Sequence, residues 1–284
     1  MAVQSHWIAM GGLCPWAEAG VGAITTQSLV EPSYGALGLN LLRTGRPAEE
    51  TLAELLDKDN NHENQQVSIV DSNGHVVTHT GKNCIAEAGH IPGAGFSVQA
   101  NMMKNPTVWS AMTNAFEKSS GDLADRLMSA LLAAESEGGD IRGKQSAAML
   151  IVDEKKTDKP WEHFLFNIRV DDHPEPLTEL QHLMNVQRAY HLMNEGDKLL
   201  GKKYFEAAML KYQAAEKFAP NIDEIPFWVG VTLADSGELE KALPIFARVF
   251  KINPNWAETV KRLSKVGFLR DDQEMMQKII TMLK

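Results

Sequence analysis

The chain has 284 residues, of which 44% are apolar and 23% charged, so we expect one or two folded domains and no long disordered region. Its formal net charge of −9 argues against nucleic-acid binding, because a protein that binds phosphates needs a basic stripe. The sequence shows neither an 18-residue apolar run nor a basic start followed by a long apolar run. We therefore expect no membrane partner and a cytoplasmic protein, in which Cys14 and Cys84 are free thiols.

The first half of the chain mixes strand-like and helix-like segments. In chain order, the predicted elements are strands at 2–9 and 20–27, helices at 34–45 and 46–59, a hairpin at 65–81, a strand at 95–100, helices at 106–119 and 121–138, and strands at 146–154 and 164–172. The hairpin prediction depends on Asn73-Gly74, a strong signal for a two-residue turn. Strands that alternate with pairs of helices predict a layered α+β domain, over residues 1–176.

From Leu177 onward the pattern is helical and contains a repeat. Gly196, Ala208, Tyr212 and Pro220 are followed, each 34 residues later, by Gly230, Ala242, Phe246 and Pro254, and Leu199 and Phe205 are matched in the same way by Leu233 and Leu239. This is the period of the tetratricopeptide repeat, in which small residues allow two helices to approach closely. A further helix pair at 256–266 and 271–283 is expected to cap the stack. We therefore predict an all-α tetratricopeptide-like domain over residues 177–284.

Seven blocks of the first half resemble a known family. They are AVQSHW, PWAEAGVGAITTQS, YGALGLNLL, VSIVDSNGHVVTHTG, GHIPGAGFSVQANMM, GGDIRGKQSAAML and RVDDHPEP, and they run in order from residue 2 to about residue 176. Together they are similar to the domain of unknown function 1028 family, which is grouped with the N-terminal-nucleophile (Ntn) hydrolases. The resemblance implies a four-layer αββα fold and hydrolysis of a small amide or peptide-like bond, without a cofactor.

The resemblance also bears on the start of the chain. Family members open with a strand whose first Thr is the nucleophile candidate, and Met1-Ala2-Val3 aligns with the second strand of that pattern. An Ntn hydrolase uses the hydroxyl or thiol of its first residue to attack and the α-amine of the same residue as the base. Neither Met1 nor Ala2 offers such a nucleophile. We expect the start to have been assigned at an internal Met, with a strand and a turn missing; the alternative is a truncated, inactive chain.

Candidate site residues lie where predicted strands end. The catalytic candidates are Ser5, His6, Asp140, Arg142 and Ser146, and the substrate-binding candidates are Thr26, Gln27, Ser28, Gln99, Asn101 and Gln145. Strand ends before helices offer backbone N–H groups to an anion, and amide side chains can donate to an oxyanion. The Asp140–Ser146 segment is similar to the Asp and Ser that support the amine in proteasome-type Ntn enzymes. Each residue also has a purely structural interpretation, as a cap, a packed histidine or a surface ion pair.

Two other functional interpretations stay open at this point. One is a non-catalytic scaffold that binds a protein partner through the repeats, and the other is a metal enzyme that uses His75, His79, His90 or Asp171-Asp172-His173. Strand residues four apart lie about 13 Å from each other, which is too far for a shared ion, so we predict no metal site. We expect the protein to form a homodimer.

Overall fold

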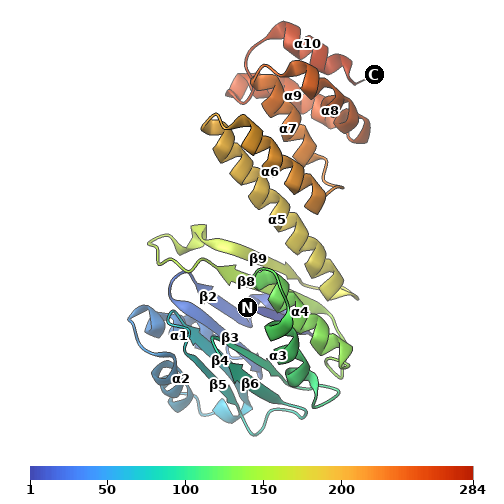
Figure 1. Cartoon of the computed structure of the whole chain (residues 1–284). Helices are drawn as coiled ribbons and strands as arrows, with labels where there is room; N and C mark the ends of the chain where they lie inside the picture. The colour runs from blue at the N-terminus through green and yellow to red at the C-terminus, as the bar shows by residue number, and fades with distance from the viewer. Residues whose placement is uncertain (284) are drawn as a thin grey trace. The chain divides into compact units, whose positions relative to one another are not determined.

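The computed structural model describes residues 1–283, which form two compact units, residues 1–184 and residues 185–283. The first unit holds every strand of the described chain, and the second is helical (Figure 1). The mixed α+β character and the helical C-terminal region are thus as predicted. Among the described residues, no helix combines the length and the apolar character that crossing a membrane requires.

Two antiparallel sheets form the centre of the first unit. One has the order β1-β8-β9, with β1 (Ala2–Ser5), β8 (Ser146–Val152) and β9 (Phe164–Val170). The other has the order β2-β3-β4-β5, with β2 (Pro15–Glu18), β3 (Gly22–Ser28), β4 (Gln65–Asp71) and β5 (Val76–Thr80). A separate pair joins β6 (Gly89–Gly93) to β7 (Phe96–Ala100). The predicted hairpin at Asn73-Gly74 is confirmed, with Gly74 at a φ of +81° between β4 and β5.

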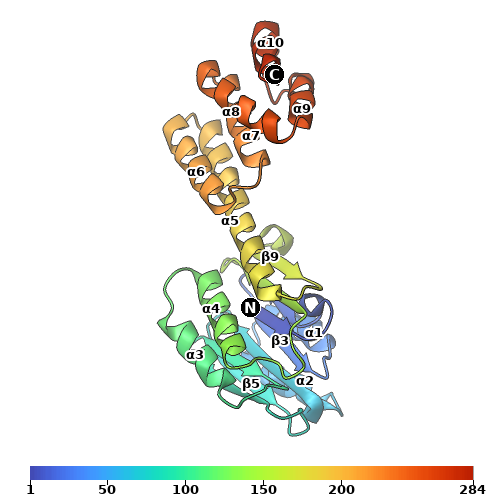
Figure 2. The ribbon, with the colours of Figure 1, turned by 90° about the vertical axis from the view of Figure 1, so that its right-hand side faces the viewer.

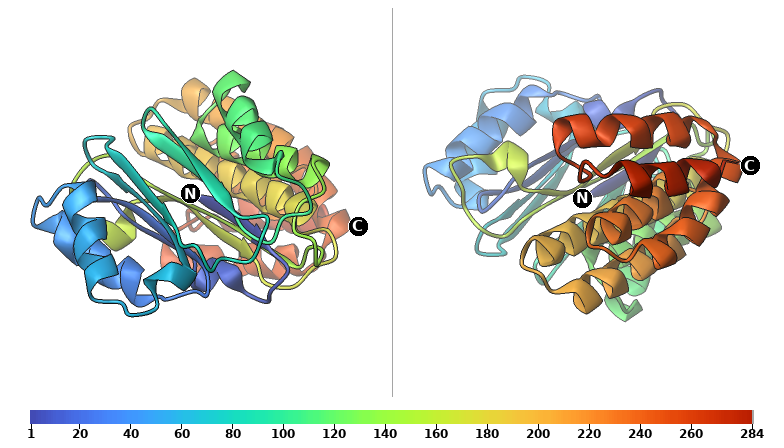
Figure 3. Two further views of the ribbon diagram at one scale, coloured as in Figure 1. Left: turned by 90° about the horizontal axis from the view of Figure 1, so that it is seen from below. Right: turned by 90° about the horizontal axis from the view of Figure 1, so that it is seen from above.

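Helices α1 (Ser33–Arg43) and α2 (Ala48–Asp57) pack on one face of the four-stranded sheet. Alternate apolar residues of the strands, such as Ile24, Val67 and Ile69, are fully buried against Leu39, Leu52 and other residues of these helices. The left view of Figure 3 shows these two helices on one side of the strands and the next helix pair on the other side. One face of the four-stranded sheet is thus covered, and its opposite face points toward the interior of the unit.

Helices α3 (Val108–Lys118) and α4 (Leu123–Ser136) lie side by side (Figure 2). Asp122 begins α4 with a capping box, in which its side chain accepts a hydrogen bond from the Asp125 amide. Met128 and Leu131 pack with β8 and β9, whereas Ala130 packs with α3 and β7. Helix α4 therefore joins the three-stranded sheet to the β6–β7 pair, which fixes the distance across the interior.

The second unit is a helical stack. It begins within α5 (Pro176–Gly201) and continues with α6 (Phe205–Phe218), α7 (Glu224–Asp235), α8 (Leu239–Ile252), α9 (Asn255–Leu263) and α10 (Gln273–Thr281). Gly196 packs against the Tyr212 ring and Gly230 against the Phe246 ring. Residues 255–281 form a further helix pair where a capping pair was predicted.

The structure corrects the set of predicted strands in three places. The first strand ends at Ser5 instead of residue 9, because the chain turns there, with Ala9 at a φ of +55° before a short 3-10 helix at Met10–Gly12. Strand β2 at Pro15–Glu18 was not predicted, and pairs with β3 across a tight turn at Gly20. Strand β6 at Gly89–Gly93 was also not predicted, since its two glycines and a proline are depleted in strands.

Candidate functional site

A cavity of about 630 Å³ lies inside the first unit. Its wall is built from β1, β3, β4, β7, α3, α4 and the connections that leave these strands and helices. Cavities that hold small ligands are of this size, mostly apolar, and carry a few placed polar groups. This cavity is therefore the first place to test for binding.

The strands turn a polar face toward the cavity because their side chains alternate. In β3, Ile24 is buried against α1 and α2, whereas Thr25 and Gln27 line the cavity. In β4, Val67 and Ile69 likewise face the helices, and Ser68 lies on the cavity side. Strands β3 and β4 are thus buried on both faces. The face toward the helices is mainly apolar, and the face toward the cavity carries polar as well as apolar side chains.

Gln99 of β7 is the centre of a hydrogen-bond network in the wall. Its Nε2 donates to Thr25 Oγ1 and to Gln27 Oε1, both at 2.7 Å. The buried Gln99 Oε1 has no hydrogen-bond partner within residues 1–283, and the same holds for three other buried oxygens of lining residues, which are Gln4 Oε1, Ser68 Oγ and Ser97 Oγ. Unpaired buried oxygens also occur away from this cavity, at Thr51 and Gln65, so the four oxygens show that the wall is polar and do not by themselves indicate a ligand.

Gln66, directly behind this wall, shows the opposite situation. It is fully buried, and its Nε2 is within 3.2 Å of Thr80 Oγ1, Gly89 O and Ala100 O, while its Oε1 accepts from Asn101 Nδ2 at 3.1 Å. The Gln66 side-chain amide connects β4 to the β6–β7 pair, which belongs to a separate sheet. Gln66 thereby fixes the position of Gln99 and Asn101.

Asp140 and Arg142 supply the charged part of the wall. Arg142 Nε and Nη2 donate to the two Asp140 carboxylate oxygens at 3.0 and 2.6 Å, and the Arg142 amide donates to Asp140 Oδ1 at 2.9 Å. The hydrogen bond to Asp140 raises the pKa of Arg142, although burial acts in the opposite direction. This bidentate pair is neutral overall, so it favours a ligand that is uncharged or dipolar over an ion.

Seven of the eleven candidate residues from the sequence line this cavity. They are Ser5, Gln27, Ser28, Gln99, Asn101, Asp140 and Arg142. The isolated bridge between Met103 and Asp140, and the bond from the Ile141 amide to Met102 O, bring the Asp140 segment next to the end of β7. The structure therefore gathers residues that are up to 137 positions apart, as between Ser5 and Arg142.

The other four candidates lie outside the cavity wall. Thr26 is fully buried on the opposite face of β3, where its Oγ1 accepts from the Glu31 amide at 3.3 Å. Ser146 is fully buried and donates to Trp7 O at 2.6 Å, so its hydroxyl holds the loop after β1. His6 is exposed, and Gln145 Nε2 donates to Asp172 Oδ1 at 3.1 Å. The grouping of Asp140 with Ser146 that the sequence predicts is not seen here.

The cavity wall also contains a thiol, that of Cys14. Burial raises the pKa of this thiol to about 12, so it is protonated at neutral pH and a poor nucleophile. No group of three or more His, Cys, Asp or Glu side chains within residues 1–283 is arranged to hold a metal ion. The polar groups of the described cavity wall are therefore hydroxyls, amides, the protonated Cys14 thiol, the Met1 amine and one ion pair.

Large apolar side chains complete the cavity. Phe116 of α3 and Leu127 and Leu131 of α4 form one wall, while Trp7 and Leu29 line it with more than half of their surface exposed, at 59% and 62%. Exposed apolar side chains beside a cavity are typical of ligand sites. A bound molecule thus meets an apolar wall on one side and the polar faces of β3, β4 and β7 on the other.

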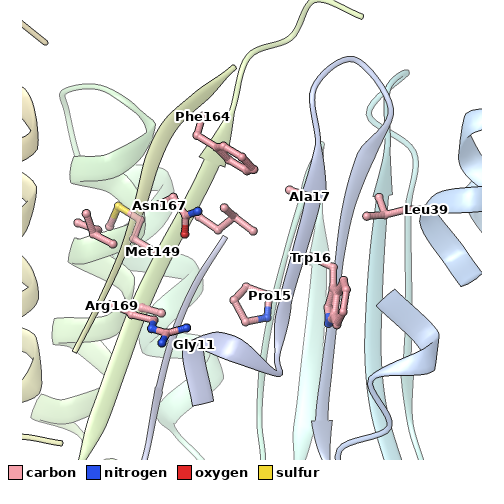
Figure 4. A pocket seen from close by; sticks show the side chains of 12 residues that line it. Gly11, Pro15, Trp16, Ala17, Leu39, Met149, Phe164, Asn167 and Arg169 are labelled. Carbon is pink, nitrogen blue, oxygen red and sulfur yellow. The ribbon is translucent and has the colours of Figure 1, made fainter. Parts of the chain in front are cut away.

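A smaller pocket of about 240 Å³ lies between β2 and the β8–β9 strands. Figure 4 shows Pro15 and Ala17 directed toward β8 and β9, and Trp16 directed toward the side of α1, where it packs on Gly35. Arg169 lines this pocket but is half-exposed and pairs with Asp171 at 3.0 Å. With one solvated ion pair and few other polar groups, the pocket offers less for recognition than the larger cavity.

Sequence reasoning missed Thr25, Ser68, Ser97 and Gln66. A signal for them was present in QQVSIVD, where Gln66 and Ser68 alternate with Val67 and Ile69. A strand in the middle of a layered fold buries both faces, so polar residues at alternate positions indicate an interior that needs polar partners. The signal for Ser97 and Gln99 in FSVQA is of the same kind.

Comparisons with known proteins bear on residues 1–180, which match the family described as "Family of unknown function (DUF1028)". A crystal structure of a protein of this family from Silicibacter pomeroyi is similar to the chain, with a TM-score of 0.57 and 26% sequence identity. The similarity covers 64% of this chain and 79% of that one. None of the curated proteins that were compared matches the chain.

Proposed function

The chain belongs to the DUF1028 family, and on this premise we propose that its first unit is an Ntn-type amide hydrolase domain whose inter-sheet cavity holds an amide or peptide-like substrate. The observation that carries the proposal is the convergence of seven candidate residues on one cavity with unpaired buried oxygens. The placement of α1–α2 and α3–α4 outside the two sheets supports the four-layer αββα arrangement.

The cavity suits an uncharged amide. The Asp140–Arg142 pair balances its own charge, and Gln27, Gln99 and Asn101 offer the donors and acceptors that a carbonyl and an N–H require. The side-chain N–H groups of Gln27 and Asn101 can donate to an oxyanion that develops on the substrate carbonyl, whereas both N–H groups of Gln99 already donate within the wall. The buried, protonated Cys14 does not supply a nucleophile.

The nucleophile in this proposal is the hydroxyl or thiol of the first residue of the mature protein, whose α-amine is the base. The test uses protein purified from its natural source, with its first residue read by mass spectrometry. It measures amine release from a panel of N-acetyl amino-acid amides.

One result supports the proposal, and two would contradict it. Amine release by a form that begins with Thr, Ser or Cys, lost in the Gln99→Leu variant while the variant stays folded, supports it. The exposed Gln213→Leu change in the helical unit is the matched control and leaves the rate unchanged. If a form that begins with Thr, Ser or Cys releases no amine from any member of the panel, or if a form that begins with Met does, the proposal is wrong.

A second candidate function is a non-catalytic scaffold that binds a protein partner through tetratricopeptide-like repeats. Its supporting observation is the packing of Gly196 on Tyr212 and Gly230 on Phe246 at a 34-residue interval. A pull-down from the natural source, compared between the full chain and a chain without residues 185–284, tests it. Partners that persist after this deletion contradict the scaffold interpretation. A homodimer stays part of this proposal, to be tested by sedimentation.

A further inference from the structure

The half-buried His90 of β6 is connected to the candidate site by hydrogen bonds. Its Nδ1 lies 2.7 Å from Oγ1 of Thr80 in β5, and the same oxygen lies 3.0 Å from Nε2 of the fully buried Gln66. Gln66 Oε1 in turn accepts from Asn101 Nδ2 at 3.1 Å. Four side chains thus form one chain of hydrogen bonds, which starts at a titratable ring outside the cavity wall and ends at Asn101 in that wall.

The direction of the hydrogen bonds in this chain follows from the groups that bind Gln66. Its Nε2 faces the carbonyl oxygens of Gly89 and Ala100, at 3.2 and 3.0 Å, and a carbonyl oxygen only accepts. Nε2 is therefore also the donor toward Thr80. The Thr80 hydroxyl carries one proton, and the hydrogen bonds of residues 1–283 offer that proton no acceptor except His90 Nδ1. The hydroxyl thus donates to His90, whose Nδ1 is unprotonated.

The surroundings of His90 favour the neutral ring. Burial lowers the pKa of His90, and the charge that His79 of β5 can carry lowers this pKa further. The other titratable side chains on the segments next to β6 are those of Glu117 and Lys118 in the last turn of α3 and of Lys82, Cys84 and Glu87 between β5 and β6. The four charged ones among them are exposed, so water screens their effect. His90 is therefore neutral at neutral pH and gains a proton as the pH falls through its lowered pKa.

Protonation of His90 changes the hydrogen bonds of the whole chain. A protonated Nδ1 donates instead of accepting, so the Thr80 hydroxyl loses its acceptor while its oxygen faces two donors. We propose that His90 is a proton-sensitive positioning residue, which acts through Thr80 and Gln66 on Asn101 in the cavity wall. With neutral His90 the chain is complete and holds Asn101. With protonated His90 the Thr80 hydroxyl rotates away, and the hold of Gln66 on Asn101 weakens.

The inference concerns the regulation of the site proposed above, and it rests on that proposal for its consequence, which is weaker amide binding in acid. Its test needs no substrate. The full chain is labelled with ¹⁵N, and the ring signals of His90 and the side-chain amide signals of Gln66 and Asn101 are followed by NMR from pH 8 to pH 5. We expect both amides to shift with the midpoint of the His90 ring, below the ordinary histidine pKa of about 6.5.

Variants of Thr80 separate the hydrogen-bond chain from simple proximity to a charged ring. Thr80→Val keeps the shape but has no hydroxyl, so we expect the shifts of the Gln66 and Asn101 amides to fall at least threefold. Thr80→Ser restores the hydroxyl and is expected to restore the shifts. Thr78→Val is the matched control, because Thr78 lies on the same face of β5, and it is expected to leave the shifts unchanged.

Two results would overturn the inference. One is that the Gln66 and Asn101 amides of the original protein do not titrate with the His90 ring, a measurement that requires no variant. The other is that they titrate in Thr80→Val as they do in the original protein. Amine release is not measured in either experiment, so failure here leaves the hydrolase proposal intact.

Discussion

The two units of the chain fill their interiors differently. In the helical unit, Tyr212, Phe227, Phe246 and Phe250 are completely buried and contact one another or the glycines of the repeat. In the first unit, the space between the sheets is a cavity of about 630 Å³ with unpaired hydroxyl and amide oxygens in its wall. Close packing is what stability alone favours, so the open polar interior of the first unit indicates a site for another molecule.

The largest expected effect comes from opening the packed interior. Phe246 is fully buried, with ring centroids 6.3 Å from Phe227 and 5.5 Å from Phe250. We expect Phe246→Ala to lower the free energy of unfolding by about 3–5 kcal/mol, because it leaves a cavity among rigid neighbours. Urea denaturation followed by circular dichroism measures this, and Ile252→Ala, on the same helix at a 63% exposed position, is expected to cost less than about 0.5 kcal/mol. Similar costs for the two changes would mean that this core is loosely packed.

A change of similar size is expected behind the cavity of the first unit. Gln66→Leu keeps the volume but leaves the carbonyls of Gly89 and Ala100 without their donor, so we expect a loss of about 3 kcal/mol. Ser68→Ala, two residues along the same strand, removes a hydroxyl with no partner and is expected to leave stability unchanged or raise it by up to about 1 kcal/mol. If Ser68→Ala destabilises the protein as much as Gln66→Leu does, the cavity wall is not under-paired.

Glycine positions of α5 allow a finer test of the helical unit. A Cβ on Gly196 would lie 2.5 Å from Tyr212 Cε1, whereas one on Gly201 would meet nothing within 4 Å. Gly196→Ala is therefore expected to cost about 1–3 kcal/mol, and Gly201→Ala to stabilise the helix by up to about 1 kcal/mol. Thermal unfolding of the two variants checks this, and equal shifts of Tm would show that Gly196 does not bring the helices together.

The smallest expected effect is a pH dependence at the edge of the first unit. Burial acts to raise the pKa of Asp71, but hydrogen bonds from the amides of His75 and Asn73 outweigh it, so the folded-state pKa is lowered. The ionised Asp71 carboxylate therefore stabilises the folded state. This stabilisation is fully present above the unfolded-state pKa of about 3.9, and it is lost as pH falls through the folded-state pKa.

Asp71→Asn removes this dependence. We expect the loss of stability between pH 7 and acid to be smaller in the variant, by about 1 kcal/mol, when urea denaturation is repeated across that range. The variant keeps the two turn residues, Asn73 and Gly74. A variant with the same pH profile as the original protein would show that the Asp71 carboxylate does not stabilise the hairpin.

The sequence predicts those parts of the fold in which local signals agree with tertiary packing. Asn73-Gly74 marks the hairpin, because the physical cause of this turn lies in neighbouring residues, and the helical periodicity after residue 177 marks a helical region. Strand β2 was missed, since Pro15 starts a four-residue strand whose existence depends on pairing with β3. Local propensity carries no information about such a partner.

The sequence likewise predicts some residues of the candidate site and misplaces others. Strand ends identified Gln27, Gln99 and Asn101, because polar residues that follow buried strands lie at the edge of the layers. Ser146, by contrast, is a strand residue whose hydroxyl is used by the Trp7 carbonyl, a contact between segments 139 residues apart. Which face of a strand meets a cavity depends on such contacts, and the sequence pattern alone does not determine them.

The most direct test of the account is to fill the cavity. Ala134 of α4 lines it and Ala133 does not, although both are partly buried on the same helix. Affinities for the N-acetyl amino-acid amides are measured for Ala134→Phe and Ala133→Phe, after circular dichroism has shown that both variants are folded. We expect Ala134→Phe to weaken binding at least tenfold and Ala133→Phe to leave it within twofold. Unchanged binding by a folded Ala134→Phe variant would contradict the claim that the inter-sheet cavity is the functional site.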